Sequence, residues 1–137
     1  TNYTIMNLAS FMKSYADEIN GQYSSYDNKN SIIIVPLAGG RFQTVIGTIK
    51  ENKLYSRNMV TFTSKICADS PDLPLKNLLK QSSLFNYGRF IISDNFLQIE
   101  AVASLDGTPE SSMKEMIQEV ANLADQYEFK LTGADVQ

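Results

Sequence analysis

Apolar residues recur at helical spacing near the start of the chain. They stand at Ile5, Leu8, Met12, Tyr15 and Ile19. Steps of three and four residues place such side chains on one face of a helix. Gly21 follows Asn20 at the point where a left-handed cap would end that helix. The pattern therefore predicts a helix over about residues 4–20, followed by a polar loop over residues 22–30.

The next part of the chain contains three runs rich in β-branched and aromatic residues. The runs cover residues 31–35, 41–49 and 54–68, with turn residues at 38–40 and 51–53. Short runs of this composition between turns are typical of strands. We predict a three-stranded meander.

A proline-containing segment, residues 69–74, then breaks the sheet. A short helix is expected after it, with Ser70 or Asp72 as its cap. The apolar stripe of this helix is formed by Leu75, Leu78, Leu79 and Phe85.

A hairpin is predicted around the two-residue turn Asp94-Asn95. With this turn, Ile92 faces Leu97. In the same register, Phe90 faces Ile99, and one side of both strands is apolar. The opposite side of the hairpin is mixed.

The last helix has a well-marked start. Thr108 is the expected N-cap, with Pro109 at the first helical position and Glu110 in the first turn. Its apolar stripe is formed by Met113, Met116, Ile117, Val120, Leu123, Ala124 and Tyr127. Residues 132–137 are predicted to form a loose tail.

These elements predict a single α+β domain over residues 1–137, with its core over about residues 4–130. The domain would have a single antiparallel five-stranded sheet with three helices, in the order α-βββ-α-ββ-α. A chain of this length buries roughly two-thirds of its unfolded surface and needs no disulfide or metal to fold.

The first three predicted strands are apolar on both sides, because side chains alternate along a strand. In the first strand, Ile32 and Ile34 point one way, and Ile33 and Val35 point the other. In the second strand, Phe42 and Ile46 oppose Val45 and Ile49. One layer of helices covers only one side, and large exposed apolar patches are rare on monomers. The other side requires a cover from the same chain, a second subunit or a bound segment of another protein.

The formal net charge of −3 hides an asymmetry along the chain. Residues 1–89 carry +4 (ten Lys/Arg, six Asp/Glu) and residues 90–137 carry −7 (two Lys/Arg, nine Asp/Glu). An acidic protein is a poor ligand for nucleic acid. No apolar run approaches the roughly 20 residues that span a bilayer. The single Cys67 cannot form an internal disulfide, and we expect a cytoplasmic protein with no membrane or nucleic-acid partner.

The sequence contains no histidine and one cysteine. Serine–histidine and cysteine–histidine catalysis and zinc sites with histidine or several cysteines are therefore excluded. Two serine–lysine spacings, at residues 10–13 and 111–114, lack the partner motifs of penicillin-recognising enzymes. The sequence places Lys50, Lys53 and Arg57 around one predicted hairpin. This cluster of basic residues is either a solvated turn or a site for an anionic ligand. We predict no enzyme, no metal and no cofactor.

The order and size of the elements resemble the type III secretion chaperone family and its YbjN-like relatives outside secretion systems. The resemblance covers about residues 4–130. It is carried by the helix Ile5–Asn20, the inserted helix around Leu75–Phe85 and the final helix Pro109–Glu128. It implies a cytoplasmic homodimer that holds an extended segment of a client protein.

The resemblance also implies which residues would bind. The client would contact Leu8, Met12, Ile33, Val35, Val45 and Ile49, and the dimer would form near Leu75, Leu78 and Leu79. Strand addition or helix-in-groove docking would supply the affinity. Two hypotheses remain open: a noncatalytic, chaperone-like protein-binding module, or a small-molecule or regulatory ligand-binding domain with a pocket between sheet and helices.

Overall fold

A computed structural model describes residues 7–133 of the chain. Within this range the helices are α1 (Leu8–Glu18), α2 (Leu75–Ser82) and α3 (Glu110–Thr132). The strands are β1 (Gln22–Ser25), β2 (Asn30–Pro36), β3 (Phe42–Asn52), β4 (Arg57–Ala68), β5 (Arg89–Ser93) and β6 (Phe96–Ser104). A short 3-10 turn at Ala38–Gly40 joins β2 to β3, and both of its glycines have the positive φ that favours glycine.

One antiparallel sheet contains all the described strands, in the order β1-β2-β3-β4-β6-β5. The α+β class, the three α-helices and the antiparallel sheet are as predicted for this part of the chain. The sheet has six strands, however, and not five. The predicted hairpin is confirmed, since Ile92 pairs with Leu97 and Phe90 with Ile99 around Asp94 and Asn95.

The additional strand is β1, which lies in the segment predicted to be a loop. It pairs with β2, with Tyr23 opposite Ile33. Gly21 is needed for this pairing and not as a helix cap, because a Cβ there would lie 2.4 Å from the Ile34 carbonyl oxygen. The left-handed residue at the end of α1 is Asn20, with φ 60°.

The helices begin at different residues from those predicted. Asn7 caps α1 by accepting a hydrogen bond from Ser10 N, and residues 4–6 of the predicted helix lie outside the described range. Pro74, and not Ser70 or Asp72, precedes α2. The last helix begins one residue later than predicted, with Pro109 at the N-cap position.

The C-terminal helix α3 also runs further than predicted. It continues to Thr132 and ends at the left-handed Gly133. Thr132 therefore belongs to α3 and not to the predicted loose tail. Residues 134–137 of that tail lie outside the described range.

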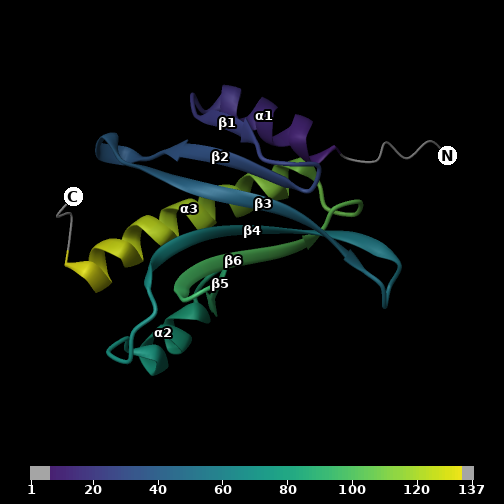
Figure 1. The fold of residues 1–137 in the computed structure, drawn as a ribbon. Helices are drawn as coiled ribbons and strands as arrows, with labels where there is room; N and C mark the ends of the chain where they lie inside the picture. The colour runs from purple at the N-terminus through teal and green to yellow at the C-terminus, as the bar shows by residue number, and fades with distance from the viewer. Residues whose placement is uncertain (1–6, 134–137) are drawn as a thin grey trace.

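The helices α1 and α3 cover one face of the sheet (Figure 1). Helix α3 packs across β3, β4 and β6, and α1 packs on β1 and β2, while α2 lies beside β5 at the other end. The two covering helices are joined by a hydrogen bond from the Tyr15 hydroxyl to Gln118 and an ion pair between Lys114 and Glu18.

The core lies between this face of the sheet and the helices. Its fully buried side chains include Met12, Ile33, Val45, Phe62, Met113 and Ile117. At Gly47 of β3 the two layers approach so closely that a Cβ would lie 2.6 Å from the Met12 sulfur. The helix and sheet layers are therefore in close contact at this position.

Candidate binding surface on the open sheet face

The residues that were predicted to bind a client lie on α1 and on the strands β2 and β3, and they point into or against the core. Leu8, Met12, Ile33, Val35 and Val45 are at most 2% exposed. Ile49 is half-buried and packs against the same core. The helices α1 and α3 occupy this side of the sheet, so within residues 7–133 these side chains have little surface available to a partner protein.

The opposite face of the sheet, which we call the open face, is not covered by any helix in residues 7–133. Four of its apolar side chains gather on β2 and β3, and we call them the apolar end: Ile32, Ile34, Phe42 and Ile46. Ile32 and Ile46 are direct partners in the ladder. Phe42 is 61% exposed, and the three isoleucines are half-buried. The predicted surplus of apolar residues exists, but on the side away from the residues chosen for client binding.

The open face changes character along the strands. Beyond Ile46 on β3 come Thr48 and Lys50, which pair with Thr61 and Met59 of β4. We call Thr48 and Thr61 the threonine row, and Val102 of β6 lies next to Thr61 at its end. The face therefore passes from apolar through threonine-rich to charged within one strand length.

The charged end forms a shallow hollow of about 510 Å³, which we call the cationic hollow. Lys50 and Lys53 line it from the β3–β4 hairpin, and Arg89 lines it from β5. Glu100 lies on its floor, 8% exposed, and accepts a hydrogen bond of 2.8 Å from Arg89 Nη2. Arg57, the third cation of the predicted cluster, does not line the hollow, whereas Arg89 does. The position of Arg89 next to Glu100 depends on the pairing of β5 with β6, and no local pattern in the sequence indicates it.

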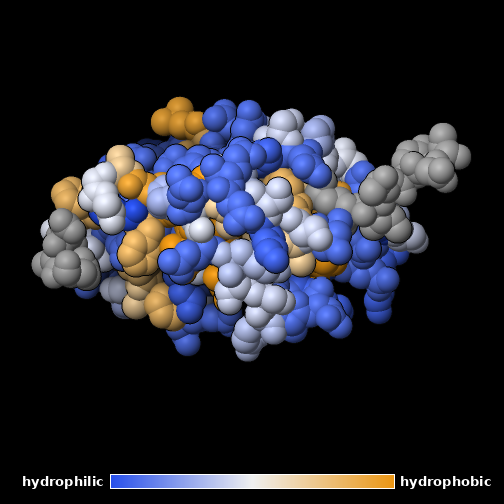
Figure 2. Space-filling view, turned by 90° about the horizontal axis from the view of Figure 1, so that it is seen from above, coloured by the Kyte–Doolittle hydropathy of each residue, from blue (hydrophilic) through white to orange (hydrophobic). Residues whose placement is uncertain are grey.

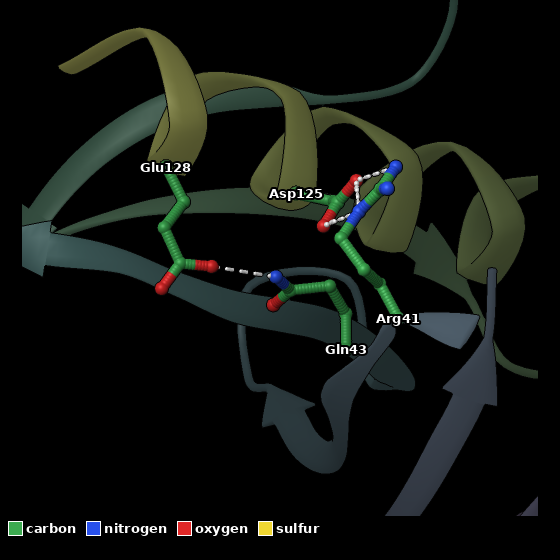
Figure 3. A network of polar contacts seen from close by, with 4 residues as sticks. All are labelled: Arg41, Gln43, Asp125 and Glu128. Carbon is green, nitrogen blue, oxygen red and sulfur yellow. Dashed lines mark hydrogen bonds and ion pairs between the residues drawn. The ribbon is translucent and has the colours of Figure 1, made fainter. Parts of the chain in front are cut away.

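Polar contacts on the helix side fix the strand that carries the apolar end (Figure 3). Gln43 of β3 is buried and donates a hydrogen bond of 2.9 Å to Glu128 of α3. Arg41 binds both carboxylate oxygens of Asp125 at 3.0–3.1 Å. Because Gln43 faces the helices, its neighbour Phe42 is held on the open face.

The predicted dimer residues on α2 divide between core and surface. Leu78 is 3% exposed and belongs to the core of its own chain. Leu75 and Leu79 are 44% and 68% exposed and lie on one outer stripe of the helix. Only two of the three predicted residues are therefore available to a second copy.

Two further regions are the side formed by α1 and β1 and a hollow at the start of α1. The side formed by α1 and β1 is mainly hydrophilic with scattered apolar groups (Figure 2). A hollow of about 340 Å³ lies where the start of α1 meets the sheet, with Leu8, Ile49 and Leu105 among its lining residues. Asn7, Asn28, Lys29 and Asn58 supply polar groups to this hollow.

The single thiol is poorly suited to reaction. Burial raises the pKa of Cys67, and the nearby carboxylates of Glu128 and Asp69 raise it further. The thiolate, which is the reactive form, is therefore a small fraction at neutral pH. Among residues 7–133, no group of three or more acidic or cysteine side chains is placed to hold a metal ion.

The chain was also compared with known proteins. No protein-family model and no curated protein matches it. In the described part of the chain, no helix combines the length and the apolar character needed to cross a membrane.

Proposed function

We propose that the chain is a noncatalytic, chaperone-like protein-binding module that holds a segment of a partner protein on its open face. The observation that carries the proposal is the apolar end. Ile32, Ile34, Phe42 and Ile46 form a continuous patch on two paired strands, and no described helix covers it. A protein with such an exposed patch gains stability by burying it against a partner.

The size of the apolar end limits what it contributes alone. Full burial of a large apolar side chain is worth about 1.5–3 kcal/mol, and three of these four are already half-buried. The four together would contribute on the order of 4 kcal/mol. Association costs roughly as much or more in lost freedom of motion. A stable complex therefore also needs the threonine row and the cationic hollow.

Affinity capture from the native cell tests the proposal. We compare the wild-type chain with Ile46→Asp, which places a charge in the middle of the apolar end. Ala9→Asp, on the exposed side of α1, is the matched control. We expect a partner that the wild type and the control retain and that Ile46→Asp loses, while circular dichroism shows that all three are folded. If no captured protein depends on Ile46, the open face is not the binding surface.

We further propose, from the resemblance to secretion chaperones, that two copies associate through α2. The exposed Leu75 and Leu79 support this arrangement. Light scattering should report a dimer for the wild type and a monomer for Leu79→Glu. Asn77→Glu, on the opposite side of the same helix, adds the same charge and is the control. A wild type that is monomeric at high micromolar concentration would contradict the dimer.

The alternative, a small-molecule-binding domain, is supported by one observation. The hollow beside α1 has the volume of a small ligand site, and apolar and polar residues both line it. Ile49→Trp would fill this hollow. Ligands from a metabolite panel that raise the melting temperature of the wild type but not of Ile49→Trp would support this function. A panel without such ligands would count against it.

A further inference from the structure

From the geometry of the open face we infer the kind of partner that it holds: an amphipathic helix of another protein, apolar in one half and acidic in the other. The inference rests on the proposed function. It goes further by naming the partner's secondary structure, its length and its charge.

The first argument concerns the backbone. The middle of the open face is formed by β2, β3, β4 and β6, and each of these strands has a neighbour on both sides in the sheet. Their backbone groups are therefore paired along most of these strands, although the ladder between β3 and β4 begins only at Ile46 and Thr63. The face presents mainly side chains. A partner lying on it has to satisfy its own backbone N–H and C=O groups. A helix does so internally, whereas an extended segment does not.

The second argument concerns length. The open-face row of β3 runs from Phe42 to Lys50, about 26 Å at roughly 3.3 Å per residue. A helix of about 18 residues spans this distance at 1.5 Å per residue. Its first half would lie over the apolar end and its second half over the cationic hollow.

The third argument concerns charge. Neither Lys50 nor Lys53 has an ion-pair partner within residues 7–133, and Arg89 contacts Glu100 through Nη2 alone. The hollow is thus lined by three cations and two carboxylates, those of Glu100 and Glu51, which leaves it a formal charge of +1. Carboxylates in the C-terminal half of a bound helix would meet these cations, and the negative end of the helix dipole would add to the attraction.

Nucleic acid is a less suitable occupant of this face. Phosphates would use the cationic hollow but leave the isoleucines of the apolar end uncovered. The chain as a whole also carries a net charge of −3, which disfavours a polyanion. The hollow lies on the same face as the apolar end, and this continuity favours a protein segment.

The test uses a fluorescent 18-residue helical peptide and the full chain. The peptide carries a leucine stripe in its N-terminal half and four glutamates on the same side in its C-terminal half. The comparison peptide has lysine in place of the four glutamates. We expect the glutamate peptide to bind at least about tenfold more tightly by fluorescence anisotropy at low salt, with a smaller difference at high salt.

Variants of the protein locate the contact. Lys50→Glu combined with Lys53→Glu should weaken binding of the glutamate peptide by about tenfold. Lys13→Glu on the exposed side of α1 should leave it unchanged. Equal affinity for both peptides, no effect of the double variant, or no binding of the glutamate peptide would each overturn the inference. In those cases a partner whose capture depends on Ile46 would still support the proposed function, whereas loss of that dependence would remove both.

Discussion

The two faces of the sheet are built from the same strands but meet different surroundings. On β2, Ile33 is fully buried beneath the helices, while Ile32 and Ile34 on either side of it are partly exposed. On β3, the buried Val45 alternates with Thr44 and Ile46 in the same way. Alternation along a strand thus gives one face that holds the domain together and one that is available to another molecule.

The comparison shows that apolar residues on both sides of a strand do not require helices on both sides of the sheet. The helices α1 and α3 lie on one side only, although the isoleucines are distributed between both sides. Stability should therefore depend on the covered face and binding on the open face. Pairs of neighbouring substitutions separate the two contributions.

The largest difference is expected between Ile33→Ala and Ile34→Ala. Removing the fully buried Ile33 side chain should lower the free energy of unfolding by about 3 kcal/mol, because it leaves a cavity. The same change at Ile34, which is only half-buried on the open face, should cost about 1 kcal/mol or less. Urea denaturation of both variants measures the difference. Equal losses would mean that something covers the open face as fully as the helices cover the other.

A second difference is expected between two glycines. The Cβ introduced by Gly47→Ala would lie within 2.6 Å of the Met12 sulfur and 3.3 Å of Phe62, so it should cost about 2 kcal/mol through overpacking. At Gly107 the nearest atom is 3.5 Å away, and alanine should have little effect. Thermal unfolding of the two variants checks this. A Gly47→Ala variant as stable as the wild type would mean that α1 is not held closely against β3.

A smaller difference is expected between Gln43→Ala and Thr44→Ala, which are neighbours on β3. The Gln43 side chain donates to Glu128 and accepts from Ser64, and its loss should cost about 1 kcal/mol. Thr44 is exposed on the open face, and its replacement should cost less than about 0.5 kcal/mol. Denaturant titrations compare the two values. A larger loss at Thr44 would reverse the assignment of the two faces.

The smallest effect concerns Cys67, which packs against the core. Its raised pKa reduces the thiolate fraction of the folded protein, so a thiol reagent at pH 8 should react more slowly than with the chain in urea. Because the pKa of Cys67 is higher in the folded protein than in the unfolded chain, its thiol contributes to stability at pH values below the usual cysteine pKa of about 8.5. This contribution is lost as the pH rises from there through the pKa of the folded protein. Equal rates with and without urea would show that the thiol is open to solvent.

Much of the fold could be predicted from the sequence because its signals are local. The Asp94-Asn95 turn sets the register of β5 and β6, and the stripe from Met113 to Tyr127 defines α3. The strand β1 could not be predicted in this way. Of its four residues only Tyr23 is apolar, and the strand is stabilised by pairing with β2, which is a tertiary effect.

The candidate site was predictable only in part. The alternation within β2 correctly separated Ile32 and Ile34 from Ile33, and within β3 it separated Phe42 and Ile46 from Val45. The alternation does not place the two strands relative to one another, because that depends on their register. It does not say which set the helices cover, and the resemblance to secretion chaperones directed attention to the covered set. The cationic hollow depends on Arg89 lying across from Glu100, and that depends on the pairing of β5 with β6.

The central claim is that a partner contacts the open face and not the surface of α1. Photocrosslinking in the native cell tests it most directly, with a benzoyl-phenylalanine in place of Ile46 in one variant and of Lys13 in another. We predict a discrete crosslinked protein from position 46 that is absent from position 13. Crosslinks from position 13 alone, or from neither position, would contradict the claim.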